Sequence, residues 1–328
     1  MENLLTIGAQ WVLAIQSLGG WLQIPMQFFS FLGSEPFFLF ILPALYWSIN
    51  TELGLRVGAI LLLNTGVNGI FKLALHAPRP YWFNPAVKAL SAEASFGAPS
   101  GHSQLAVGVW GSLAAWWRKP WGWALAIAII FLIGFSRLYL GVHFPQDVLL
   151  GWALGALILT LAWKLWTPLA AWLKGKSLAL EIFLALALAL ILLTVGALAR
   201  PASFPAEWST NAALAGAKSA PAPLGLDGLV TASGTLFGLL TGLAWLNRRG
   251  GFSAEGTLTR RALRFALGLL GVAALWFGLG AIFPRGDDFL AYFLRFVRYS
   301  LLGGWISAGA PWLFLRLGLS IKQTDVMQ

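Results

Sequence analysis

The sequence predicts an all-α fold, a polytopic bundle of transmembrane helices with interfacial helices at its amino end. Of the 328 residues, 58% are hydrophobic and only 10% are charged, whereas soluble domains carry roughly a quarter charged residues. The apolar residues form runs of about the length that a bilayer core requires. Tryptophans gather at the ends of several runs, as at residues 116–123, which is typical of aromatic belts at the membrane surface. The protein is therefore predicted to be an integral membrane protein.

The predicted helices follow from interruptions of the apolar pattern. Residues 1–34 carry four glutamines, and Gly19, Gly20 and Pro25 break the apolar run. We expect interfacial helices there, with a membrane span within residues 4–32 as the alternative. About nine spans follow. They are residues 35–49, 53–74, 101–117, 121–140, 146–171, 178–198, 227–246, 262–282 and 294–317.

The domain organisation is predicted from the position of polar motifs. Residues 35–200 hold three short polar motifs and are predicted to be a catalytic transmembrane core. Residues 201–226 are rich in Ala, Pro and Gly and are predicted to be an extracytoplasmic loop. Residues 227–328 are predicted to be a carboxy-terminal region of three transmembrane helices, which carries no motif.

Three short polar segments interrupt the apolar chain. They read Lys72-x6-Arg79-Pro80, Pro99-Ser100-Gly101-His102 and Ser136-Arg137-x5-His143-x3-Asp147. Ionisable residues near a bilayer are costly, so their concentration in three places indicates a functional site. If the predicted spans alternate in direction, all three segments fall on one face of the membrane.

The chemistry of these segments points to phosphate. Lys72, Arg79 and Arg137 supply cations, and guanidinium groups bind phosphate through charge-assisted hydrogen bonds. Ser100 is a plausible N-cap, and Gly101 allows close backbone approach at a helix N-terminus, which favours anions. The second segment thus predicts an oxyanion site in the first turn of a helix.

The third segment supplies a nucleophile. His143 precedes Pro145, which suits the first turn of a helix, and Asp147 follows one turn after His143. A carboxylate there can hold one ring nitrogen as N–H and leave the other lone pair for attack on phosphorus. A leaving group then needs an acid, and His102 is the other histidine in a defined motif.

Taken together, the three segments resemble the signature of the type 2 phosphatidic acid phosphatase superfamily, and each defining position is matched. The resemblance implies that His143 attacks phosphorus to form a phosphohistidine, that Asp147 orients it, and that His102 is the general acid. It also implies that the phosphate-binding residues are Lys72, Arg79, Ser100, Gly101 and Arg137. Members of this family use no metal or other cofactor, so we expect neither here.

The resemblance implies a phosphatase acting on a phosphomonoester or diphosphate. We expect a lipid substrate of the polyprenyl pyrophosphate, phosphatidate or phosphatidylglycerophosphate type, which reaches the site from the surrounding membrane lipids. The residues that flank the first and third motifs are similar to the glucose-6-phosphatase branch. A small soluble phosphate such as a sugar phosphate is therefore the alternative.

Two functions from other classes stay open. A lipid transporter or scramblase could use the cations to bind headgroups, although it needs no particular spacing of His143 and Asp147. A vanadate haloperoxidase has a similar pocket, although such enzymes are typically soluble. Outside the motifs, His76 is expected to be a loop or pocket-wall residue, and Glu93 could shape the pocket entrance.

The charge pattern predicts orientation and excludes one kind of partner. The net charge is +10, but the Lys and Arg residues lie in short clusters between apolar runs, so we expect no nucleic-acid partner. Most basic residues outside the motifs fall on the face opposite the motifs. The positive-inside rule places the motif face away from the cytoplasm, and we expect a bacterial inner membrane. The oligomeric state is left open.

Overall fold

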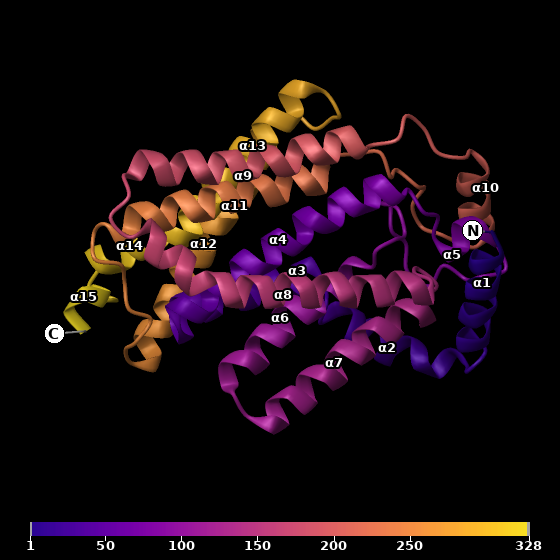
Figure 1. Ribbon diagram of the computed structural model, residues 1–328, viewed down its shortest axis with the longest axis horizontal. Helices are drawn as coiled ribbons and strands as arrows, with labels where there is room; N and C mark the ends of the chain where they lie inside the picture. Colours follow the sequence, from indigo (N-terminus) through magenta and orange to yellow (C-terminus); the bar gives the residue numbers. More distant parts are fainter. Residues whose placement is uncertain (1, 327–328) are drawn as a thin grey trace. The chain divides into compact units, whose positions relative to one another are not determined.

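The computed structural model describes residues 2–326, and within that range the regular secondary structure is entirely helical (Figure 1). The α-helices are α1 (Glu2–Gln16), α2 (Gln23–Phe31), α3 (Glu35–Ala44), α4 (Thr51–Leu75), α5 (Pro80–Phe83), α6 (Gly101–Trp117), α7 (Pro120–Tyr139), α8 (Pro145–Leu173), α9 (Leu178–Ala199), α10 (Glu207–Leu214), α11 (Asp227–Asn247), α12 (Leu258–Ile282), α13 (Phe289–Gly304), α14 (Ala310–Arg316) and α15 (Gln323–Val326). Two π-helical turns, Leu45–Ile49 and Trp305–Gly309, extend α3 and join α13 to α14. The predicted all-α class is confirmed.

Six of the described helices are long and apolar enough to cross a membrane: α4, α7, α8, α9, α11 and α12. The other predicted spans also fall on helices, but these are shorter or interrupted. The 17-residue α6 coincides with the predicted span 101–117. The two π-helical turns lie within the predicted spans 35–49 and 294–317. The polytopic helical membrane fold is confirmed, and the total of about nine crossings stays a prediction.

The amino-terminal segment forms two short helices, α1 and α2. The break between them is at Gly19, whose φ of 110° favours glycine. Apolar side chains such as Trp11, Ile24 and Phe28 are exposed on these helices. With 15 and 9 residues, α1 and α2 are shorter than a typical span, so an interfacial position remains our proposal for them.

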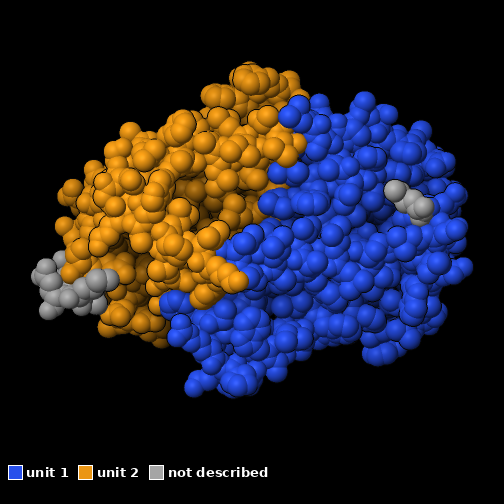
Figure 2. Space-filling model, viewed as in Figure 1, with its two compact units in different colours: residues 1–38, 67–161, 196–225 blue, residues 39–66, 162–195, 226–328 orange. Residues whose placement is uncertain are grey.

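The chain divides into two compact units (Figure 2). Unit 1 comprises residues 1–38, 67–161 and 196–225, and unit 2 comprises residues 39–66, 162–195 and 226–328. All three polar motifs belong to unit 1. These units are defined by contacts in space, whereas the domains predicted from the sequence are defined by the position of the motifs. The predicted domains therefore stay a prediction.

Unit 2 is built on close helix packing. A Cβ on Gly238 of α11 would lie 1.9 Å from the carbonyl oxygen of Ser300 on α13, and one on Gly303 would lie 2.2 Å from that of Thr235. Small residues at such points let helix backbones approach, which is how transmembrane helices pack without a hydrophobic driving force. A cluster of buried side chains that includes Trp47, Phe252 and Phe314 forms a hydrophobic core in this unit.

The segment expected to be a loop at residues 201–226 contains a helix, α10, which packs against α5 in unit 1. Trp208 stacks on Trp82 with 5.7 Å between ring centroids. The side-chain amide of Asn211 donates to the Trp82 carbonyl oxygen at 2.9 Å. This segment therefore covers the short helix that follows the first motif, instead of lying free as a loop.

Candidate active site

The first motif lies at the end of α4 and just before α5. Lys72 is in the last turn of α4, and its ammonium group donates to the carbonyl oxygens of Phe96 and, at 3.3 Å, Gly97. His76 follows the last residue of α4 with a φ of 36° and is exposed, as a loop residue. The chain then turns so that Arg79 immediately precedes α5, which starts at Pro80.

Arg79 is the most heavily bonded side chain of the site. It is 1% exposed. Its Nε donates to the Ser95 carbonyl oxygen at 2.7 Å, and one Nη donates to the Ser95 hydroxyl and the Phe96 carbonyl oxygen, each at 3.1 Å. Its other Nη donates to the Val142 carbonyl oxygen at 2.9 Å and lies 3.4 Å from Nε2 of His143. The guanidinium fork thus connects the first motif to the loop before α6 and to the third motif.

The second motif starts α6. Ser100 is fully buried and is the N-cap, accepting a hydrogen bond from the Ser103 backbone N–H, so the predicted cap is confirmed. A Cβ on Gly101 would lie 3.2 Å from the side-chain oxygen of Asn68, which explains the need for a small residue there. The Asn68 amide donates to the Gln104 side chain at 2.8 Å and thereby ties α4 to α6.

The third motif spans the turn between α7 and α8. Arg137 lies in the last turn of α7, and Gly141 makes the turn with a φ of 77°. Pro145 starts α8, as predicted. Nδ1 of His143 lies 3.4 Å from a carboxylate oxygen of Asp147. The same oxygen accepts the Phe144 backbone N–H at 2.9 Å, which fixes the carboxylate beside the imidazole.

A further hydrogen bond joins the second and third motifs. The Ser100 backbone N–H donates to the Asp147 carbonyl oxygen at 2.9 Å. This bond and the contacts of Arg79 together link the three motifs, which extend over 75 positions of the chain, from Lys72 to Asp147. The structure thus brings the three predicted motifs together within unit 1.

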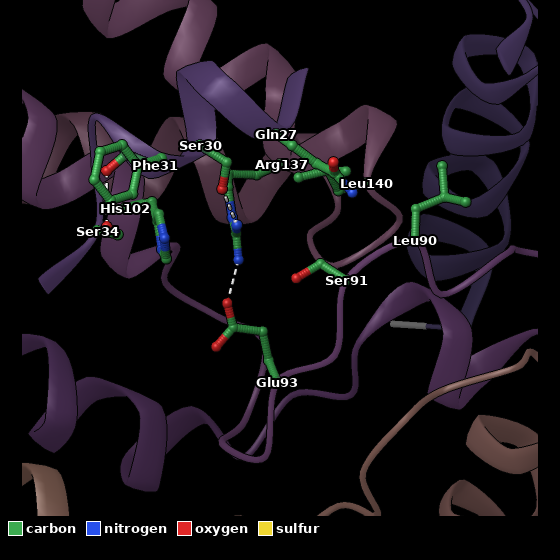
Figure 3. A pocket seen from close by; sticks show the side chains of 10 residues that line it. All are labelled: Gln27, Ser30, Phe31, Ser34, Leu90, Ser91, Glu93, His102, Arg137 and Leu140. Carbon is green, nitrogen blue, oxygen red and sulfur yellow. Dashed lines mark hydrogen bonds and ion pairs between the residues drawn. The ribbon is translucent and has the colours of Figure 1, made fainter. Parts of the chain in front are cut away.

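A cavity of about 240 Å³ opens beside two of the predicted residues, His102 and Arg137 (Figure 3). Its lining is completed by Gln27, Ser30, Phe31, Ser34, Leu90, Ser91, Glu93 and Leu140. Arg137 points at Glu93 and forms an ion pair with it. An anion that binds Arg137 from the cavity therefore meets a guanidinium that already has a carboxylate partner.

Charge and burial set the protonation of two groups in the loops of the site. Burial alone would raise the pKa of Glu93, but the guanidinium groups of Arg137 and Arg79 hold that pKa well below its usual range. Burial lowers the pKa of His143 well below its usual range, and the charges of Arg79 and Lys72 lower it further. His143 is therefore neutral at physiological pH, which leaves one ring nitrogen with a free lone pair.

The pKa of His143 gives a direct prediction. The chain has three histidines, so a His76→Gln/His102→Gln protein with labelled histidine shows only His143 by NMR. We expect its imidazole to stay neutral as the pH falls from about 8 to below 6, because the folded pKa lies below the unperturbed value of about 6.5. A titration midpoint at or above 6.5 would contradict this environment.

Some residues of the site were not predicted as site residues. The sequence indicates Glu93 only for the pocket entrance, whereas in the structure it is the ion-pair partner of Arg137. Ser30 and Ser95, which accept hydrogen bonds from Arg137 and Arg79, were not singled out. Neither serine belongs to a local motif, so the sequence holds no signal for it. Within residues 2–326, no three His, Cys, Asp or Glu side chains are grouped as a metal site would require.

Comparison with known proteins decides the family. The model of the PAP2 superfamily matches residues 53–171, which contain all three motifs. A second model, described as the transmembrane extension of PAP2 superfamily phosphatases, matches residues 230–323. The chain belongs to the PAP2 superfamily. The predicted type 2 phosphatidic acid phosphatase membership is thus confirmed, and the carboxy-terminal helices are an extension known in this superfamily.

Individual PAP2 relatives match less of the chain. Sphingosine-1-phosphate phosphatase 2 of Homo sapiens is 33% identical over 149 residues, which are 43% of this chain and 37% of the relative. Glucose-6-phosphatase 3 of Bos taurus is 29% identical over 183 residues, 48% of this chain and 53% of the relative. A crystal structure of a transmembrane PAP2 type phosphatidylglycerolphosphate phosphatase from Bacillus subtilis is 26% identical, with a TM-score of 0.44 over 52% of this chain and 88% of that chain. The chain thus spans between about a third and about a half of the length of the two curated relatives.

Proposed function

We propose that this PAP2 protein is a membrane phosphatase that hydrolyses a lipid phosphate through a phosphohistidine on His143. The observation that carries the proposal is the environment of that imidazole. Asp147 lies at Nδ1, and Arg79 lies 3.4 Å from Nε2. A neutral imidazole held in this way has its lone pair at Nε2, beside a guanidinium that can bind a phosphoryl oxygen.

The reaction runs in two steps on these residues. Nε2 of His143 attacks phosphorus, the bond from phosphorus to the ester oxygen breaks, and His102 gives its proton to that oxygen. A water molecule then attacks phosphorus, His102 takes up a proton of the water, the bond from phosphorus to Nε2 of His143 breaks, and phosphate leaves. Arg79, Arg137 and Lys72, with Ser100 and the Gly101 N–H at the start of α6, stabilise the charge on the equatorial oxygens.

The membrane setting supports a lipid as the substrate. Polyprenyl pyrophosphate, phosphatidate and phosphatidylglycerophosphate types were expected, and the similarity to a sphingosine-1-phosphate phosphatase supports a lipid phosphate. The similarity to a glucose-6-phosphatase supports the alternative of a soluble sugar phosphate. The asymmetry of basic loop residues supports a site on the extracytoplasmic side of a bacterial inner membrane.

The substrate class is tested by phosphate release from a panel of lipid and soluble phosphates, with EDTA present. We expect release from lipid phosphates, with kcat/KM rising with acyl-chain length because remote binding energy lowers the barrier. We expect inhibition by vanadate and none by EDTA. Faster release from glucose 6-phosphate than from any lipid would favour the sugar-phosphate alternative. Loss of activity in EDTA would contradict the metal-free mechanism, and silence of a folded protein across the panel would favour a transporter.

The role of His102 is tested by the leaving group. A His102→Ala protein should lose about 10²- to 10⁴-fold in the rate of phosphoenzyme formation with alkyl esters. It should lose far less with a nitrophenyl ester, whose phenolate leaves without a proton. Single-turnover kinetics on both esters measure this difference. An equal loss on both would remove the acid role and leave His102 as a binding residue.

A further inference from the structure

Helix α2 contributes to the cavity from outside the matched family region. The PAP2 model begins at residue 53, whereas α2 comprises Gln23–Phe31. Even so, Gln27, Ser30 and Phe31 of α2, with Ser34 just after it, line the cavity beside His102 and Arg137 (Figure 3). No role in the shared PAP2 chemistry accounts for this helix.

Ser30 holds the guanidinium of Arg137. The Ser30 side chain is buried, and its hydroxyl accepts a hydrogen bond from one Nη of Arg137, while the other Nη is paired with Glu93. α2 packs along α7, the helix that carries Arg137. Because a guanidinium fork is rigid, fixing one nitrogen fixes the direction in which the others point. Ser30 is therefore a positioning residue for Arg137.

Gln27 and Ser34 provide polar groups that Arg137 does not use. Gln27 is exposed, so its amide can both donate and accept hydrogen bonds within the cavity. The Ser34 hydroxyl donates to the Phe31 carbonyl oxygen at 2.7 Å and accepts the Phe37 backbone N–H at 3.5 Å, which leaves one lone pair as an acceptor. Both residues line the same cavity as Ser30, and Ser30 contacts the phosphate-binding Arg137. They are placed to meet the part of a substrate that lies beyond the phosphate.

The charge of the lining restricts what that part can be. Arg137 is the cation among the lining residues, and Glu93 is the carboxylate. A second phosphate next to the first would meet the ionised Glu93 and no further Lys or Arg of the lining. A neutral hydroxyl or an amine would instead meet an amide, hydroxyls and a carboxylate, while Phe31, Leu90 and Leu140 offer apolar contacts for carbon chains.

The outer side of α2 is apolar. Ile24 is 78% exposed and Phe28 is 57% exposed. They are separated by four positions and so share one helix face, which is distinct from that of the buried Ser30, while Gln27 lies at the edge between the two faces. An apolar outer face with a polar cavity face suits a helix at the membrane surface, where a lipid headgroup and its chains meet.

We propose that α2 is the substrate-selecting wall of the site. Ser30 positions Arg137 on the phosphate, and Gln27 and Ser34 hydrogen-bond a hydroxyl or amine close to phosphorus in a lipid phosphomonoester. Such a wall favours lipid phosphomonoesters with a free hydroxyl or amine near phosphorus, such as phosphorylated long-chain bases or lipids that end in a phosphorylated glycerol, over polyprenyl diphosphates. The substrate class rests on the proposed phosphatase function, whereas recognition by α2 can be measured without turnover.

The test uses two phosphonates, which bind but are not hydrolysed: an alkylphosphonate and the same compound with a hydroxyl near phosphorus. We expect the full-length protein to bind the hydroxylated compound about tenfold more tightly, in line with one or two hydrogen bonds. Gln27→Ala/Ser34→Ala should abolish this preference. Gln23→Ala, a glutamine of the same helix outside the cavity lining, should keep it.

Each outcome of the binding test bears on the inference. An equal affinity of the wild type for both phosphonates, or no binding of either, would overturn it, and so would a preference that survives the double substitution. If the preference behaves as expected while lipid phosphates are not hydrolysed, recognition by α2 stands and the proposed function fails. If hydrolysis occurs but the preference is absent, only the inference fails.

The positioning role of Ser30 has a separate readout. Ser30→Ala should raise Kd for both phosphonates about five- to tenfold and by the same factor, because it acts through Arg137 and the shared phosphate. Ser30→Thr, which retains the hydroxyl, should restore the affinity. A loss that Ser30→Thr does not restore, or one confined to the hydroxylated compound, would contradict the role.

Discussion

Replacement of His143 by alanine is expected to abolish phosphate release, with a loss of about 10⁴-fold or more in kcat, the magnitude seen when a covalent nucleophile is removed. The physical reason is that, in the proposed mechanism, Nε2 of His143 is the atom that forms the bond to phosphorus. His143 is 1% exposed and lies between Arg79 and Asp147. Steady-state phosphate release from the preferred lipid phosphate measures the loss.

The control for this variant is binding. His143→Ala keeps Arg79, Arg137 and Lys72, so an alkylphosphonate, which binds without a bond to Nε2, should still bind it with an affinity within about tenfold of the wild type. His76→Ala replaces an exposed histidine that follows α4 and should leave kcat within about twofold of the wild type. Turnover by His143→Ala above about 1% of the wild type would remove His143 as the nucleophile.

Replacement of Arg79 by lysine is expected to lower kcat/KM by about 10²- to 10³-fold, the usual cost of losing a fixed donor to the transition state. Lysine keeps the positive charge but not the planar fork. It cannot donate at once to the loop carbonyl oxygens of Ser95 and Phe96 and to that of Val142 next to His143. Because the positive charge is retained, a loss of kcat/KM measures the contribution of the guanidinium geometry and not that of the charge. The measurement is kcat/KM on the same lipid phosphate.

Arg264 offers a matched control for that substitution. Its guanidinium is also buried, and it donates to the backbone carbonyl oxygens of Ser253, Ala254 and Glu255 in unit 2. Both Arg264→Lys and Arg79→Lys should lower the midpoint of thermal unfolding, but Arg264→Lys should leave kcat/KM within about twofold. Equal losses of kcat/KM in both proteins would show that Arg79 acts only on stability.

Most of the fold and the three motifs could be predicted from the sequence, because both depend on local signals. Long apolar runs determine membrane helices, Ser100 caps α6, and Pro145 starts α8. The catalytic spacing of His143 and Asp147 corresponds to one helical turn. Such signals are contained within a few residues, so the sequence displays them directly.

The remainder of the site depends on contacts between distant positions. Ser30 and Arg137 are separated by 107 positions, and nothing near either residue indicates the other. The acceptors of Arg79 are mostly backbone carbonyl oxygens, which every residue type has, so the identity of Phe96 or Val142 carries no information about them. The contact of α10 with Trp82 is of the same kind, since it depends on how a surface segment folds back onto the core.

The central claim is that phosphorus is transferred to His143. The most direct measurement quenches the wild-type protein with alkali during turnover of a lipid phosphomonoester in EDTA and locates the phosphoryl group by mass spectrometry. We expect an alkali-stable, acid-labile phosphoryl group on His143, and none in the His143→Ala protein. Hydrolysis with the phosphoryl group on another residue, or rapid turnover during which no phosphoprotein forms, would contradict the mechanism.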